Sequence, residues 1–361
     1  MQALLQRSAR ALLQSQLLNL HSYVAPTTYL QEPVSLPAAA WRHWLISQAG
    51  FCSQAATSDT SKIACLNGVR GVLHLGGEDV HHFLNGIITN DPNLLQKESM
   101  DVIYTAFLNA QGRFLHDAFL YATGEPFGIL ADVDKAHMPA LMRLLKTYKL
   151  RAKVDVRDVS DSFDVWARFG TASSSKALED GWPLDPRTPE LGQRTILPKS
   201  AEGALELPPA DPGQYRQWRH SLGIAEGPSE IPPGSAVPLE YNLDGLDAIS
   251  FTKGCYVGQE LIARTHFRGV VRKRVVPVTY DESSGVLEEG MDVYAEGAAR
   301  PVGKISVAGD GSGRALALLR LQAAFDGKQL RARSKEGPVV SAHRPSWWPP
   351  GWGREEEQQQ P

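Results

Sequence analysis

The spacing of apolar residues changes period several times along the chain, and the order of these changes constrains the fold most strongly. Residues 78–88 and 138–148 repeat apolar side chains every three to four positions, which predicts two amphipathic helices. Short runs around them alternate or are continuously apolar, as strands do. These runs are 63–66, 69–75, 102–108, 113–121, 127–133, 150–158 and 163–169. An order of strand, helix, strands, helix and strand indicates an α+β fold rather than an array of βαβ units.

Turn signals indicate which of these strands are neighbours. Asn67-Gly68 separates the first two runs and is a common hairpin dipeptide. The stretch 109–112, Asn-Ala-Gln-Gly, joins two longer runs and predicts a second hairpin. Asn90-Asp91-Pro92 ends the first helix, and a short helix is expected over 215–222.

The second half of the chain changes character after residue 268. From Val271 to Val340, short strand-like runs are separated by Gly and Asp turns, which predicts a small β-barrel or sandwich. We therefore expect a first region at 62–268 with two subdomains and a variable insert at 173–186. A C-terminal barrel at 269–345 and a Trp/Pro clamp with a disordered tail at 346–361 complete the predicted organisation.

The N-terminal residues resemble a targeting segment. Residues 1–30 contain arginine, serine and many leucines but no acidic residue, which is typical of a transit peptide, with a frayed amphipathic helix as the alternative. Residues 31–61 have the composition of a linker. No stretch reaches the roughly 18 apolar residues of a membrane span, and a net charge of −3 argues against nucleic acid as a partner. The cysteines, Cys52, Cys65 and Cys255, make no disulfide framework and suggest a reducing compartment.

The stretch Lys253 to Glu260 reads K-G-C-Y-V-G-Q-E and places a cysteine between two glycines. Glycines permit positive φ or close backbone approach, so a tight loop is expected around the thiol of Cys255. Lys253 would stabilise a thiolate and make the sulfur a better ligand or nucleophile. A helix is expected to begin within G-Q-E-L-I-A-R, with Glu260 in its first turn, where a negative charge suits the helix dipole.

Cys255 has no partner at metal-site spacing. A zinc or iron-sulfur site needs about four ligands, so a metal at Cys255 must be shared with another molecule. His266 is the nearest second ligand, although a surface histidine is the simpler interpretation. A Cys/His hydrolase would need a base that the sequence does not place.

Asp117 lies inside the apolar run 113–121, and it either faces solvent or has a specific buried partner. Asn90-Asp91 is a further candidate site at a helix end. The basic cluster Arg272-Lys273-Arg274 is either a solvated strand edge or a contact for a polyanionic ligand.

Taken together, these motifs resemble a known family. The stretch K-G-C-Y-V-G-Q-E, then A-R-T-H and G-V-V-R-K-R, resembles the signature of folate-binding, aminomethyltransferase-like proteins that help assemble iron-sulfur clusters. The likeness runs from about Ile63 to Trp348 and includes F-L-N-A-Q-G-R, D-P-R, L-G-I-A-E-G-P and P-L-E-Y-N. It implies a ring of domains around a central folate-type cavity, with a small C-terminal β-barrel. With the leader, it implies the mitochondrial matrix, with the plastid stroma as the alternative.

The resemblance also implies roles. It implies an A-type iron-sulfur scaffold as partner, with Cys255 as a ligand of a shared cluster within a motif made of Lys253, Gly254, Cys255, Tyr256, Val257, Gly258, Gln259, Glu260 and Arg264. Tetrahydrofolate would contact Asn90, Asn109, Asp117, Arg272 and Asp91. The related aminomethyltransferases use an aspartate in the strand that resembles the one carrying Asp117, so a folate-dependent one-carbon enzyme is the alternative function. Ser221 stands where those enzymes have a pterin-binding glutamate. A purely structural binding module is a third class.

Overall fold

The structure is a computed structural model, and it describes residues 61–96, 100–123, 128–170, 182–205, 209–309 and 311–352. The predicted transit peptide, nearly all of the predicted linker, most of the predicted insert and the end of the predicted tail lie outside these ranges.

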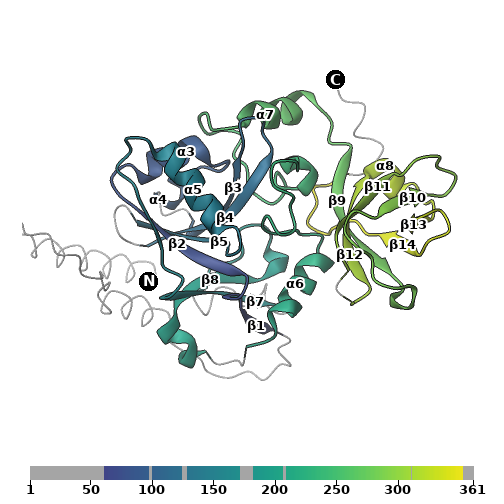
Figure 1. The fold of residues 1–361 in the computed structure, drawn as a ribbon, viewed down its shortest axis with the longest axis horizontal. Coiled ribbons are helices and arrows are strands. Elements are labelled where there is room, and N and C mark those ends of the chain that lie inside the picture. Colours follow the sequence, from purple (N-terminus) through teal and green to yellow (C-terminus); the bar gives the residue numbers. More distant parts are fainter. Residues whose placement is uncertain are drawn as a thin grey trace, which may run out of the picture. The chain divides into compact units, whose positions relative to one another are not determined.

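A five-stranded antiparallel sheet, in the order β3-β4-β5-β2-β6, forms the larger part of the first region (Figure 1). The predicted hairpin at 109–112 is confirmed, since β3 pairs with β4 from Val102↔Tyr121 to Leu108↔Phe114. The strands are β2 (Arg70–Gly76), β3 (Val102–Leu108), β4 (Phe114–Ala122), β5 (Gly128–Asp134) and β6 (Asp155–Asp158).

Both predicted amphipathic helices are confirmed, as α3 (Val80–Ile87) and α5 (Met138–Lys149), and the short α4 (Asn93–Gln96) follows α3. The apolar stripes of α3 and α5 pack against alternate strand residues, such as Leu73, Ile103 and Leu120. Successive strand side chains point to opposite faces. Asp117 and Asp132 therefore lie on the face of the sheet away from these two helices.

A three-stranded sheet, β1-β7-β8, contains β1 (Lys62–Cys65), β7 (Phe163–Phe169) and β8 (Gln193–Pro198). The predicted hairpin at Asn67-Gly68 is wrong, because β1 pairs with β7 whereas β2 pairs with β5 and β6. The carbonyl of Leu66 accepts hydrogen bonds from the amides of Val69 and Arg70, so the turn redirects the chain from one sheet to the other.

Two further helices flank the candidate sites. The helix expected over 215–222 is confirmed as α6 (Pro212–Ser221), which begins earlier because Asp211 caps it through the amide of Gly213. The helix expected at Glu260 is α7 (Gln259–Arg268).

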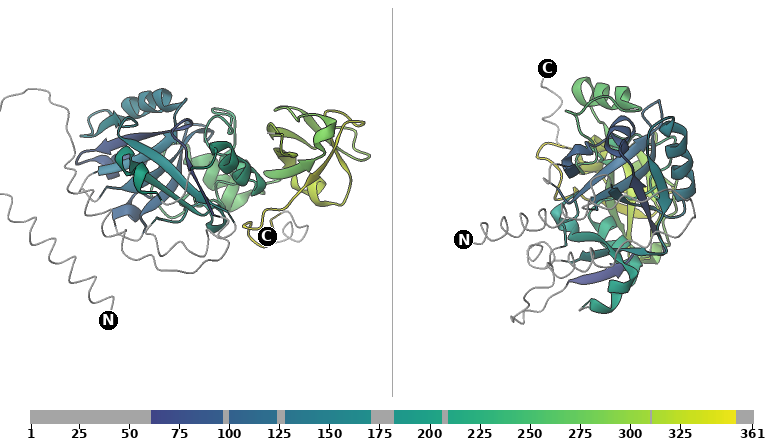
Figure 2. Two further views of the ribbon diagram at one scale, coloured as in Figure 1. Left: turned by 90° about the horizontal axis from the view of Figure 1, so that it is seen from below. Right: turned by 90° about the vertical axis from the view of Figure 1, so that its left-hand side faces the viewer.

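The predicted C-terminal barrel is confirmed as a closed antiparallel barrel in the order β10-β11-β12-β9-β14-β13 (green to yellow in Figure 2). Trp348 is 5% exposed and joins the barrel core, as a clamp would require, and the indole of Trp347 donates to the carbonyl of Leu222. The elements are β9 (Lys273–Tyr280), β10 (Asp292–Ala295), β11 (Gly303–Val307), β12 (Arg314–Arg320), α8 (Leu321–Phe325), β13 (Leu330–Ala332) and β14 (Val339–Ala342).

Within the ranges that the structure describes, none of the helices combines the length and the apolar character needed to cross a membrane.

Candidate functional site

The loop that carries Cys255 is anchored on the carboxyl end of α3. The ammonium of Lys253 donates to the carbonyl oxygens of Asn85, Ile88 and Asn90 at 2.8, 2.8 and 2.9 Å. A cation suits the negative end of a helix dipole and supplies donors to carbonyls that have no partner within the helix. The backbone of Lys253 is thereby tied to α3, two residues before the thiol.

This arrangement changes the role expected for Lys253. An ammonium group has three N–H donors, and the three carbonyls use them all, so none remains for the thiolate of Cys255. Burial lowers the pKa of Lys253 to about 8, with Asp91 opposing the shift. Below that pH the Lys253 ammonium is a cation that fixes the loop. It does not hydrogen-bond the sulfur of Cys255.

The other end of the loop is fixed by a glycine-to-glycine contact. Gly258 has a φ of +82°, and a Cβ there would approach the carbonyl of Asn109 and lie 3.0 Å from the Cα of Gly112. Gly112 has a φ of +76°, and a Cβ there would lie 2.8 Å from the carbonyl oxygen of Gly258. The β3-β4 turn and the cysteine loop, which the sequence identified separately, therefore pack directly against each other.

Most other motif residues support this geometry. Tyr256 is buried, which raises its pKa to about 12, and the amide of Val257 donates to the carbonyl of Gly86. Glu260 and Arg264 form a 3.8 Å pair on the surface of α7. Cys255 itself is exposed. The motif thus presents its thiol to solvent while its neighbours hold the backbone.

His266, the nearest candidate for a second ligand, is exposed on α7 and stacks on Phe251 with the ring centroids 3.6 Å apart. Among the described residues, no group of three or more His, Cys, Asp or Glu side chains could hold a metal ion.

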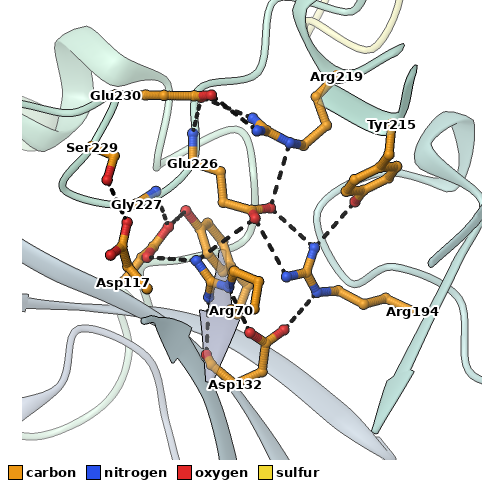
Figure 3. A network of polar contacts seen from close by, with 12 residues as sticks. Arg70, Asp117, Asp132, Arg194, Tyr215, Arg219, Glu226, Gly227, Ser229 and Glu230 are labelled. Atoms are coloured by element: carbon orange, nitrogen blue, oxygen red, sulfur yellow. Dashed lines mark hydrogen bonds and ion pairs between the residues drawn. The ribbon is translucent and has the colours of Figure 1, made fainter. Parts of the chain in front are cut away.

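Asp117 lies in a buried ionic network between the two sheets (Figure 3). Its side chain is fully buried; Oδ2 accepts hydrogen bonds from the hydroxyl of Tyr104 and the amide of Gly227, both at 2.9 Å. Arg70 lies 3.7 Å from Oδ1. The interpretation that Asp117 faces solvent is therefore wrong, because this face of the strand is covered by other polar side chains.

Glu226 is the centre of that network. Its carboxylate accepts hydrogen bonds from Arg187 at 2.7 Å and Arg194 at 3.1 Å, with Arg70 at 3.6 Å and Arg219 at 3.8 Å. Although burial alone would raise the pKa of Glu226, the four arginines hold it well below its usual range. Burial raises the pKa of Asp117, against the opposing effect of Arg70. Glu226 is thus the fixed anion of the network.

Asp132 joins the two sheets in the same network. One of its oxygens accepts from Nε of Arg70 on β2 at 2.6 Å, and the other accepts from Nε of Arg194 on β8 at 2.7 Å. Asp185, at the end of the predicted variable insert, is buried and accepts two hydrogen bonds from the guanidinium of Arg187. Sequence reasoning did not assign Arg70, Arg187, Arg194 or Glu226 to any site; the only signal was their presence in or near conspicuous motifs such as D-P-R and A-E-G-P.

The residues expected to contact tetrahydrofolate are largely engaged by the protein itself. The amide of Asn90 donates to the carbonyls of Tyr104 and Asp247, and Asp91 accepts from the amide of Asn93 at the start of α4. The side chain of Asn109 closes its own turn by accepting from the amides of 111 and 113. Arg272 is exposed ahead of the barrel strand β9. With Asp117 buried as well, four of these five residues make hydrogen bonds within the protein, and Arg272 is the one of the five that is exposed.

Gly258→Ala tests the glycine contact. An alanine at positive φ costs about 1–2 kcal/mol, and its Cβ must also displace the turn at Asn109, so we expect a loss of about 2 kcal/mol or more in the free energy of unfolding. Gly86→Ala is the matched control, since no atom lies within 4 Å of its Cβ position; we expect it to be neutral or to stabilise by up to about 1 kcal/mol. Urea unfolding followed by circular dichroism measures both, and equal effects would refute the contact.

Asp132→Asn and Asp117→Asn test the ranking within the ionic network. Asp132→Asn turns an amide N–H toward a buried arginine and should cost about 3–5 kcal/mol. Asp117→Asn retains an oxygen for Tyr104 and Gly227 and should cost only about 1–2 kcal/mol. The midpoints of urea unfolding give the order, and a larger loss for Asp117→Asn would show that the network is centred elsewhere.

Comparison with solved structures supports the fold. The glycine cleavage system aminomethyltransferase T from Bartonella henselae superposes with a TM-score of 0.55 at 14% identity, covering 80% of this chain and 86% of that one. At this identity the likeness establishes the fold alone, and it confirms the expected aminomethyltransferase-like class. Residues 272–350 match the family model described as the CAF17 C-terminal beta-barrel domain.

Comparison with known sequences identifies the family. The chain is 36% identical over 306 residues to mouse "Iron-sulfur cluster assembly factor IBA57, mitochondrial", covering 78% of this chain and 84% of the mouse protein. The human protein of the same name is 36% identical, with 78% and 83% covered. The homolog from Mycosarcoma maydis is 36% identical over 249 residues, and there the match spans only 61% of the relative's length. The chain therefore belongs to the IBA57 family of iron-sulfur cluster assembly factors.

Proposed function

We propose that this protein is a mitochondrial iron-sulfur cluster assembly factor, and that Cys255 supplies one thiolate to a cluster shared with an A-type scaffold protein in the maturation of [4Fe-4S] proteins. The observation that carries the proposal is an exposed thiol on a loop whose two ends are fixed, at Lys253 by α3 and at Gly258 by the β3-β4 turn. The names of the relatives support the assembly role and the mitochondrial location. We place the protein in the matrix.

A shared site follows from the number of ligands. Clusters are held by about four protein ligands, and no group of candidate ligand side chains gathers in the described part of the chain. Cys65, at the end of β1, is only partly exposed. The remaining ligands must then come from a partner, and the cluster is cargo that passes through the complex.

The loop is suited to a bulky partner at its sulfur. Gly254 is exposed. A Cβ added at Gly254 would have the side-chain Nδ2 of Asn85 as its nearest neighbour, at 3.9 Å. A ligand on a preformed loop binds with less loss of conformational entropy than one on a flexible segment. The fixed backbone therefore favours the thiolate as a cluster ligand.

Cys255→Ser should abolish the shared cluster. After anaerobic reconstitution with iron, sulfide and an A-type scaffold, we expect visible absorption and iron content in the isolated complex to fall to the level of the scaffold alone, because a serine hydroxyl is not ionised as a thiolate is. Cys65→Ser is the matched control, since burial raises the pKa of that thiol and it lies in a strand. The ligand assignment is wrong if Cys255→Ser leaves iron content unchanged.

The alternative of a folate-dependent transferase depends on Asp117, and we propose that tetrahydrofolate does not reach that carboxylate in this protein. Oδ2 is occupied by two donors, and Oδ1 faces Arg70 inside a network with no exposure at Asp117. A pterin there would have to break hydrogen bonds to a charged group, each worth about 1.5–3 kcal/mol.

Titration with tetrahydrofolate should therefore show no binding that depends on Asp117. We expect calorimetry to give the same weak or absent signal for the wild-type protein and for Asp117→Asn, with folding of the variant confirmed by circular dichroism. Micromolar binding, or aminomethyl transfer that Asp117→Asn removes without unfolding the protein, would instead support the transferase.

A further inference from the structure

Three aromatic rings form a cluster on the surface beside the cysteine loop. The rings of Phe251 and His266 stack at 3.6 Å with an interplanar angle of 15°, and Phe267 meets His266 edge-on at 4.9 Å and Phe251 at 6.1 Å. None of the three belongs to the core of the sheet region or of the barrel. Phe267 is 67% exposed. The cluster is therefore an ordered apolar feature that folding alone does not bury.

The helix that carries two of these rings has its own inner face. Ile262 is fully buried, and Leu261 is partly buried against the turn at Gly112. An exposed stripe of α7, at spacings of four, seven and eight residues from Glu260, contains Arg264, Phe267 and Arg268. Val270, beyond the helix, is 58% exposed. A large phenyl ring in the middle of a charged helix face, next to further apolar surface, is typical of an interaction site.

The cluster lies close to the thiol because the loop returns along the helix. Phe251 stacks on His266 in the last turn of α7. From Phe251 the chain runs through Cys255 to Gly258, which precedes the first turn of the same helix. Four residues of extended chain span at most about 14 Å, so the Cα atoms of Phe251 and Cys255 lie within that distance of each other. A standard interface buries about 800 Å² on each partner, equivalent to a disc of about 16 Å radius. One partner can therefore cover both the thiol and the aromatic cluster.

The charges around the cluster indicate the chemistry of that partner. Arg264 keeps 65% of its side chain exposed despite its 3.8 Å pair with Glu260, and Arg268 is exposed on the same face. A cluster ligated by thiolates carries net negative charge, and acidic side chains around it would complement these arginines. The surface fits an acidic, cluster-carrying protein with an apolar side chain at its centre.

We propose that the aromatic cluster of Phe251, His266 and Phe267, with Arg264 and Arg268, is the docking surface for the partner that supplies the other cluster ligands. The proposal rests on the proposed function and adds the surface to it. Phe267 is the apolar anchor at the interface, and the two arginines align the acidic rim of the partner so that its ligands meet Cys255.

The test separates docking from ligation by using the cluster-free partner. We expect Phe267→Ser to weaken the apo complex with an A-type scaffold at least tenfold in Kd, as for an interface anchor, and Phe267→Leu to restore most of the affinity. Cys255→Ser should leave the Kd of the apo complex unchanged within about twofold while removing the cluster. Val286→Ser is the matched control, since Val286 is 52% exposed on the barrel. Arg268→Glu should lower the association rate and its dependence on salt.

Three results would overturn the proposal, and they are distinguishable. If the wild-type protein binds the scaffold and Phe267→Ser binds equally well, the surface is elsewhere and the function stands. If light scattering shows that Phe267→Ser dissociates a homodimer while scaffold binding is unchanged, the surface binds a second copy of the chain. If the wild-type protein binds no A-type scaffold, the proposed function fails and this occupant fails with it.

Discussion

The carboxylate of Glu226 is the interaction on which the arrangement of the first region depends. It lies among Arg70 from the five-stranded sheet, Arg194 from the three-stranded sheet, Arg219 from α6 and Arg187 from the segment before β8. A buried anion that loses one of its partners leaves an uncompensated charge, which costs several kcal/mol. The two sheets and α6 therefore cannot shift independently of one another.

The same network encloses the carboxylate on which the alternative function, a folate-dependent transferase, depends. The strand that carries Asp117 is retained, yet Tyr104, Gly227 and Arg70 enclose its side chain. A shared fold carries no information about whether such a carboxylate is open to a substrate. The cysteine loop packs instead on the turn of the β3-β4 hairpin at Gly112, and our proposal places the chemistry on that loop.

Local patterns in the sequence predicted much of the fold, and long-range contacts were the part they could not predict. The period of apolar residues located α3, α5 and the barrel strands, because each face packs against a core close to its own element. Asn67-Gly68 does not join a hairpin, because β1 pairs with β7 and β2 pairs with β5 instead of with each other. The role of Glu226 was also hidden, since its arginine partners lie 7 to 156 residues away in the sequence and only folding brings them together.

The candidate site shows the same division between local and distant information. The sequence located Cys255 and its glycines, but it suggested that Lys253 acts on the sulfur, whereas the ammonium binds three carbonyls at the end of α3. A cation that is close in sequence does not hydrogen-bond the sulfur when the carbonyls of a helix end use all of its donors. Because Lys253 and Gly258 both fix the backbone of the loop, they give the thiol a fixed position rather than a hydrogen-bond donor. Under the proposed function, the positive charge that favours a cluster thiolate comes from the iron itself, while Arg264 and Arg268 attract the acidic rim of the partner. A ligand on this loop then depends on docking.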